Sequence, residues 1–154
     1  MKSAAGWHLD DLFAMFPDVS RGTDRVLRCL WRTSGEGRCI KEEAGVRRWS
    51  TVSLSARPAG QFVLRLTHSW PVSLGAPDRQ AIQLALLRGI LEGTVNCEDP
   101  PWQCHLECNA VDWSPTGGAG GAATLVRAAA ALAIQDLVRG GGWEAVGSPG
   151  DHVA

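Results

Sequence analysis

Apolar residues recur at the spacing of an α-helix in three segments of the chain. Residues 7–16 form a short amphipathic segment that ends at Pro17, and residues 77–93 begin at a proline and end at a glycine. Residues 122–138 are rich in alanine and are followed by a run of glycines. The pattern therefore predicts one short helix near the N-terminus and two longer helices in the second half of the chain.

Four other segments alternate apolar and polar residues, as half-buried strands do. These segments are residues 26–33, 49–57, 62–70 and 102–111. Residues 38–48 have no clear period and are expected to form a long loop, and the glycine-rich residues 112–121 are expected to form another. The predicted order of elements is β-β-β-α-β-α, preceded by the short helix.

This order predicts an α+β fold, a two-layer sandwich in which a four-stranded sheet carries two helices on one face. The other face of the sheet is then polar. Its expected members are Arg28, Arg32, Ser53, Ser55, Arg57, Arg65, Thr67, His105, Glu107 and Asn109. We expect an N-terminal helix and linker in residues 1–24, one domain in residues 25–140 and a flexible tail in residues 141–154.

Composition adds limits on partners and location. The chain has 154 residues, enough for a single core, and its net charge of −1 gives no overall field that would attract nucleic acid. Five cysteines at scattered positions predict reduced thiols in a cytoplasmic protein. No continuous apolar run approaches the ~20 residues of a membrane span, and the N-terminus predicts no secretory signal. No cofactor is expected.

Three stretches resemble domain IV of translation elongation factor G, a domain also present in its eukaryotic relative and in the ribosomal protection proteins. Residues 43–52 resemble the glycine- and arginine-containing loop that leads into the second strand of that domain. Residues 76–93 are similar to its first helix and the glycine turn that ends it. Residues 108–133 resemble its last strand, tip loop and alanine-rich helix.

The resemblance implies a stand-alone binding module with a ribosomal-protein-like β-α-β fold. The sequence has no G-x-x-x-x-G-K-[ST] loop, so no GTPase activity is implied. In the family, two loops form a tip that enters the decoding region of the small ribosomal subunit, which implies ribosomal or other structured RNA as the partner. The corresponding binding residues here are Arg47, Arg48, Trp49, Asp112, Trp113, Ser114 and Thr116. The second of these loops has lost the positive charge that the family carries there.

The residue types in the first loop suit this partner. Two guanidinium groups beside an indole, as in Arg47, Arg48 and Trp49, can hold phosphates and stack a base. The alternative is a loop in which Trp49 only anchors the start of a strand. The glycines of the second loop either present backbone N–H groups to an anion or let the chain turn into the last helix.

A second hypothesis is a small cytoplasmic protein of a small-molecule biosynthetic or resistance pathway, acting as an enzyme or a ligand carrier. Its site would be the polar sheet face around Arg28, Arg65, His105 and Glu107. His105 and Glu107 share a face and could form an acid–base pair, or could be ordinary cross-strand surface charges. No serine or cysteine lies in a nucleophile motif, so no catalytic residue is assigned. A third hypothesis is a partner-docking or homo-oligomeric subunit that uses the helix of residues 7–16.

The densest group of metal-ligand residue types is Cys97, Cys104, His105 and Cys108. Cys104 and Cys108 lie ~13 Å apart along a strand, and His105 points to the opposite face. A single ion could not collect these side chains while the strand persists. We therefore predict buried thiols and no metal site.

Overall fold

The structure is a computed structural model that describes residues 6–22, 25–71, 74–115 and 118–147. Its helices and strands are, in chain order, α2 (Leu9–Met15), β1 (Arg25–Cys29), β2 (Thr33–Glu43), β3 (Val46–Pro58), β4 (Val63–Leu66), α3 (Ala76–Val95), β5 (Cys104–Trp113), α4 (Gly118–Arg139) and β6 (Trp143–Gly147).

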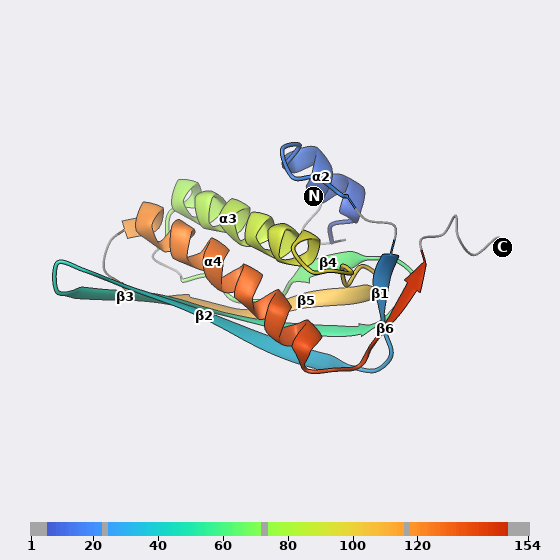
Figure 1. Ribbon diagram of the computed structural model, residues 1–154. Coiled ribbons are helices and arrows are strands. Elements are labelled where there is room, and N and C mark those ends of the chain that lie inside the picture. Colours follow the sequence, from blue (N-terminus) through green and yellow to red (C-terminus); the bar gives the residue numbers. More distant parts are fainter. Residues whose placement is uncertain (1–5, 23–24, 72–73, 116–117, 148–154) are drawn as a thin grey trace.

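The main sheet has the strand order β2-β3-β5-β4, and α3 and α4 cover one of its faces (Figure 1). β2, β3 and β5 are antiparallel neighbours, whereas β4 runs parallel to β5. The elements of this two-layer unit follow the predicted order β-β-β-α-β-α, with the short helix α2 before them. The predicted α+β sandwich with two helices on one face of a four-stranded sheet is therefore confirmed.

The predicted first strand, residues 26–33, is correct only over residues 26–29 and is wrong in its placement in the main sheet. Arg25–Cys29 forms β1, which pairs antiparallel with Trp143–Gly147, or β6, in a separate two-stranded sheet. The first strand of the main sheet is β2, which begins only after this pairing ends. The tail predicted to be flexible, residues 141–154, therefore contributes a strand, and its last part, residues 148–154, lies outside the described residues.

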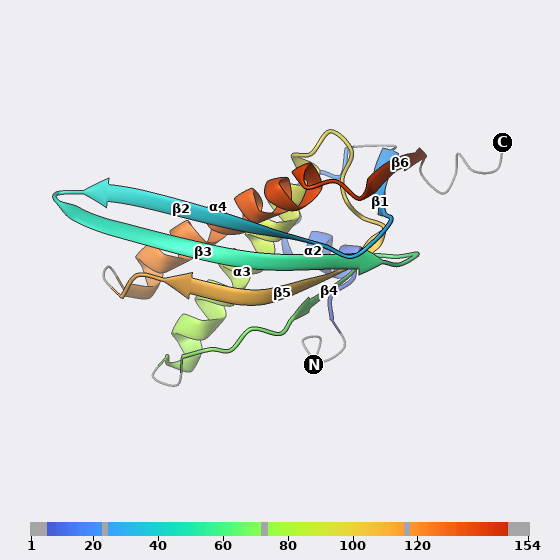
Figure 2. The same ribbon diagram turned by 90° about the horizontal axis from the view of Figure 1, so that it is seen from below.

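The predicted loop of residues 38–48 is also wrong, because these residues belong to a long β-hairpin. β2 pairs with β3 along its whole length, and only Ala44 and Gly45 separate the two strands. The φ angles of these two residues are 51° and 79°, the positive values that a tight two-residue hairpin turn requires. The hairpin reaches beyond the helices at one end of the molecule (Figure 2).

Glycine explains why the sequence hid strand β2. Gly35 and Gly37 occupy the positions that face the helices, where an ordinary strand shows large apolar residues. A Cβ atom at Gly37 would lie 2.0 Å from the carbonyl oxygen of Ala129 in α4. A Cβ atom at Gly35 would lie 2.4 Å from the backbone nitrogen of Leu137. The backbones of β2 and α4 are thus in direct contact, which only residues without a side chain allow.

Glycine also brings the two long helices together. A Cβ atom at Gly89 of α3 would lie 2.3 Å from the carbonyl oxygen of Arg127 in α4, and one at Gly93 would lie 2.9 Å from the Cα atom of Ala131. Above this contact, the Arg127 guanidinium donates to the Glu92 carboxylate at 2.6 Å, and Arg127 is the main cause of the lowered pKa of Glu92. The two helices are therefore joined by close backbone contact at Gly89 and Gly93 and by the ion pair between Arg127 and Glu92.

Helix α4 changes one expectation from the sequence. Its segment Gly121–Arg139 is long and apolar enough to span a membrane by length and composition alone, whereas the sequence pattern predicted no such segment. In the fold, Val126, Ala130 and Ile134 of this helix are completely buried. A core helix meets the same criterion, so length and composition alone do not make this helix a membrane span.

Helix α2 uses its apolar side within the domain. Leu12 is completely buried, Phe16 is 7% exposed, and the ring of Phe13 contacts that of Trp102 edge-on at 5.8 Å. Just before the helix, the backbone of Trp7 exchanges two hydrogen bonds of 2.8 Å with Leu64 on β4. This segment covers the edge of the main sheet, so we expect its deletion to destabilise the domain.

Candidate functional site

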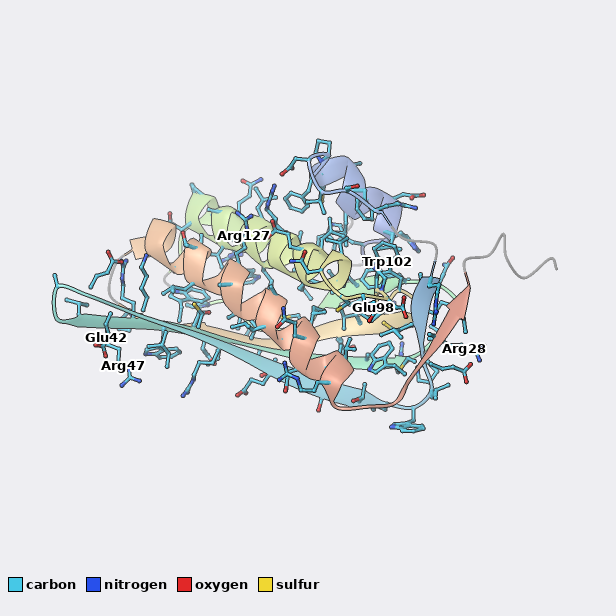
Figure 3. The ribbon with its side chains drawn as sticks, viewed as in Figure 1. Arg28, Glu42, Arg47, Glu98, Trp102 and Arg127 are labelled. Carbon is cyan, nitrogen blue, oxygen red and sulfur yellow. The ribbon has the colours of Figure 1, made fainter. Side chains whose placement is uncertain are left out.

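The hairpin places neighbouring arginines on opposite sides. Arg47 is exposed on the sheet face that carries no helix, and its side chain points away from the helices (Figure 3). Arg48 faces the helix side, where its guanidinium donates to Glu43 at 3.1 Å and approaches Gly121 of α4. The two guanidiniums that the sequence placed together are therefore separated, and only Arg47 is directed outward.

The outward side of the hairpin brings Arg47 and Trp49 of β3 next to Arg38 and Ile40 of β2. These four residues line a shallow recess of about 290 Å³, and we refer to them as the hairpin patch. Ile40 lies opposite Trp49 and is 43% exposed. Glu42 lies opposite Arg47 on the same side (Figure 3), but no ion pair joins them. The patch combines two cations with an apolar, partly aromatic surface.

The second predicted loop is tied to the base of this hairpin. The backbone N–H of Trp49 donates to the Ser114 hydroxyl at 3.1 Å, and the Ser114 N–H donates to the Trp49 carbonyl at 2.9 Å. Ser114 is only 6% exposed, so its contacts are structural. Strand β3 and the segment after β5, which the resemblance assigns to one tip, are thus hydrogen-bonded to each other.

The other residues of the second loop have different surroundings. Asp112 is exposed on β5 opposite Thr51, whereas Trp113 packs against the core, with its ring 6.4 Å from that of Trp70. Thr116, also predicted to bind, lies outside the described residues. The cationic and aromatic groups that face outward at this end come from the hairpin.

At the opposite end of the same sheet face, a second group of polar side chains meets. Arg65, His105 and Glu107, predicted for the alternative site, lie together with Arg32 and Arg57 around one surface depression. Its interior has room for about 10 Å³, the volume of a single water probe, so it is not a pocket for a whole small molecule.

Arg28 does not belong to this group. It lies on β1 and forms an ion pair with Glu144 on β6, in the separate two-stranded sheet. The sequence placed it on the main sheet face because residues 26–33 were taken as one strand. The four residues predicted for the alternative site are therefore divided between two sheets.

The arginines differ in whether a carboxylate neutralises them. Ion pairs involve Arg21, Arg25, Arg28, Arg48, Arg88 and Arg127. On the outer face of the main sheet, five arginines form no ion pair with any described residue: Arg32, Arg38, Arg47, Arg57 and Arg65. This face also carries four carboxylates, Glu36, Glu42, Glu107 and Asp112. Its charge is close to balanced overall: Glu42 and Asp112 share the hairpin end with Arg38 and Arg47, and the excess of cations lies at the opposite end.

His105 is held neutral by its surroundings. Partial burial lowers its pKa, and the charges of Arg57, Arg65 and His8 lower it further. Its Nδ1 atom lies 3.4 Å from a guanidinium nitrogen of Arg57. Because a guanidinium only donates, Nδ1 is the acceptor and the ring proton is assigned to Nε2. His105 thus adds an N–H donor to a group of guanidinium donors.

All five cysteines are free thiols; Cys29, Cys104 and Cys108 are buried, whereas Cys39 and Cys97 are only partly buried. Cys104 and Cys108 are completely buried on the helix side of β5, and burial raises the pKa of Cys108 to about 12. Burial also raises the pKa of Cys104. Among the described residues, no three His, Cys, Asp or Glu side chains are placed to share a metal ion. The thiols therefore act as small apolar groups.

His68 is a buried polar residue that the sequence pattern did not identify. It follows β4, is 9% exposed, and its ring meets that of Trp70 edge-on at 4.4 Å. Neither ring nitrogen has a hydrogen-bond partner among the described residues. Burial lowers the pKa of His68 from the ordinary value of 6.5, so its neutral form is favoured in the folded protein.

We expect the free energy of unfolding to decrease as the pH falls below 6.5, because the unfolded chain then binds a proton that folded His68 resists. Urea unfolding at a series of pH values measures this slope. In His68→Leu we expect a shallower slope and no loss of stability at pH 8, since two unsatisfied nitrogens are removed. An unchanged slope in His68→Leu would assign the pH dependence to other groups.

Comparisons with known proteins bear on the fold. No protein-family model and no curated protein matches the chain. Among solved structures, a crystal structure of a protein from Thermus thermophilus is similar, with a TM-score of 0.62 and 15% sequence identity over 82% of this chain. The matching part covers 18% of that longer protein. At this identity, the similarity shows a shared fold and nothing about activity.

Proposed function

We propose that the chain is a non-GTPase binding module of the elongation factor G domain IV type, and that the hairpin patch contacts ribosomal or other structured RNA. The observation that carries this proposal is the arrangement on the outer side of the hairpin. Arg38 and Arg47, free of ion pairs with the described residues, flank the indole of Trp49 on strands that project beyond the body (Figure 2).

This chemistry suits single-stranded parts of folded RNA. A guanidinium presents a planar fork of donors that matches phosphate oxygens, and neither Arg38 nor Arg47 is held in an ion pair with a described residue, although Glu42 lies opposite Arg47. Unpaired bases in loops and bulges are recognised by stacking on aromatic side chains. The recess between Trp49 and Ile40 is open and shallow, which fits a base laid on a surface better than an enclosed ligand.

The sheet between the two ends supports contacts of a second kind. Thr51, Ser53 and Ser55 form a row of hydroxyl groups along the outer side of β3, and Asn109 donates to Ser55 at 3.1 Å. Hydroxyl and amide groups commonly contact the phosphates and sugars of nucleic acids. Because the net charge is −1, we expect binding to depend on these local contacts and to be sensitive to salt.

The alternative of a small-molecule enzyme or carrier is less well supported. The residues around His105 and Glu107 enclose room for about one water molecule. A general acid–base pair needs a substrate held within hydrogen-bond distance of both groups, and this depression does not hold one. The surface at that end is nevertheless rich in donors.

Co-sedimentation with 30S subunits and 70S ribosomes over a series of salt concentrations tests the proposed function. We expect saturable binding of the full chain at low salt and loss of that binding at high salt. In the double variant Arg38→Gln/Arg47→Gln we expect binding to fall by about tenfold or more, because two charge-assisted contacts are lost.

Arg28→Gln is the matched control. It removes the same type of charge at the other end of the molecule, where Arg28 is neutralised by Glu144 (Figure 3). We expect this variant to sediment with ribosomes as the unmodified protein does. No binding of the unmodified chain at low salt, or equal losses in both variants, would contradict the proposal.

A further inference from the structure

The far end of the outer sheet face holds a second concentration of positive charge, separate from the hairpin patch. Arg32 precedes β2, Arg57 ends β3, and Arg65 lies on β4, so three segments of the chain bring a guanidinium to one depression. None of the three has an ion-pair partner within the described part of the chain. The three guanidiniums repel one another across this depression, and a bound anion would relieve that repulsion.

The side chains around this depression carry a net positive charge. The three guanidiniums are opposed by a single carboxylate, Glu107, which lies beside Arg65 in the register of β4 and β5. His105 adds no charge near neutral pH, because partial burial and its arginine neighbours lower its pKa. We propose that the cluster of Arg32, Arg57, Arg65 and His105 binds the phosphoryl group of a phosphate monoester.

A phosphate monoester fits both the charge and the donors. It carries a charge of about −1.5 to −2 at pH 7 and offers three strong acceptor oxygens. Arg57 and Arg65 are exposed forks of N–H donors from neighbouring edges of the depression. His105 is hydrogen-bonded through Nδ1 to Arg57, which leaves its Nε2–H as a further donor. Every group of the cluster is then a donor, and Glu107 is a neighbouring acceptor outside the cluster.

The shape of the depression limits what else the site holds. It has room for about 10 Å³, about one water molecule, so one phosphoryl oxygen enters and the rest of the ligand remains on the surface. A free phosphorylated metabolite and the 5′-phosphate end of an RNA share this chemistry. The inference concerns side chains outside the hairpin patch and stands whether or not that patch binds RNA.

The resonances of His105 provide the test, because its ring lies among the proposed contacts. Its pKa is measured by NMR on the full chain with inorganic phosphate at millimolar concentration, and again with chloride at the same ionic strength. We expect phosphate to raise the pKa of His105, since a bound dianion offsets the neighbouring guanidiniums.

Two variants decide whether the effect comes from this cluster. In Arg57→Gln/Arg65→Gln we expect a higher pKa of His105 before any addition, and phosphate affinity weakened by about tenfold or more. In Arg79→Gln, on helix α3 in the other layer of the sandwich, we expect the response of the unmodified protein. The same rise in all three proteins, or no rise in the unmodified chain, would overturn the proposal.

The same measurement separates the two sources of phosphate. We expect adenosine monophosphate to act as inorganic phosphate does, and adenosine to have no effect. A short RNA with a 5′-phosphate that acts at lower concentration than the same RNA without it identifies an RNA end as the ligand. Equal effects of the two RNAs, together with a response to adenosine monophosphate, identify a small phosphorylated compound.

Discussion

Gly37→Val lowers the free energy of unfolding by about 3 kcal/mol, the largest loss of stability we expect from a change of this size. A Cβ atom at this position would lie 2.0 Å from the carbonyl oxygen of Ala129 and 2.3 Å from the backbone nitrogen of Ala133. These are backbone atoms of a buried helix, so relief requires β2 and α4 to separate. Urea or thermal unfolding followed by circular dichroism measures the effect.

Gly60→Ala is the control for the added methyl group. Gly60 follows β3 in a turn, no atom lies within 4 Å of the Cβ position, and its φ is outside the left-handed region. We expect its stability to change by less than about 0.5 kcal/mol. Similar stability of Gly37→Val and Gly60→Ala would show that the strand and helix are not in the close contact described.

Trp49→Ala weakens binding to a structured RNA by about tenfold or more, because base stacking on an aromatic side chain contributes about 1–3 kcal/mol per base. Trp49 lies in the middle of the outward side of the hairpin, beside Ile40 and between the two arginines of the patch. In Trp49→Phe, which keeps an aromatic face, we expect most of the affinity to remain. Fluorescence anisotropy with a labelled RNA hairpin measures both variants.

Trp31→Ala is the matched control for this result. Trp31 is 59% exposed and lies next to Gly142, outside the hairpin patch. We expect its replacement to leave RNA affinity unchanged, and circular dichroism to show that all three variants are folded. If Trp31→Ala weakens binding as much as Trp49→Ala does, general aromatic contacts rather than the hairpin patch bind the RNA.

The sequence pattern was sufficient to locate helices and strands whose buried residues recur at a regular spacing. The two long helices, β3 and β5 carry apolar residues at recurring helix or strand spacing, and these elements were located to within a few residues. It failed for β2, because Gly35 and Gly37 replace the apolar residues that would have completed the alternation. It also failed for the β1–β6 pair, since two short strands far apart in the chain specify each other only through tertiary contact.

The candidate site was predicted only in part, because strand β2 was not recognised in the sequence. Arg47 and Trp49 were identified from residue type, but Arg38 and Ile40 were missed because residues 38–48 were taken as a loop. The Ala44–Gly45 turn was the signal available, since a glycine in a two-residue turn favours a hairpin. Because β3 begins at Val46, Arg47 and Arg48 both lie in a strand, where successive side chains point to opposite faces. When these residues are taken as a loop, the two side chains cannot be assigned to different faces.

The salt dependence of RNA affinity in Arg47→Gln and Arg48→Gln tests the central claim most directly. These arginines are adjacent in sequence, but Arg47 faces outward and Arg48 is paired with Glu43 on the helix side. If the outward side of the hairpin contacts phosphates, the slope of log affinity against log salt becomes shallower by about 1 in Arg47→Gln and stays unchanged in Arg48→Gln. Equal slopes in the unmodified protein and Arg47→Gln, or a loss only in Arg48→Gln, would contradict the account.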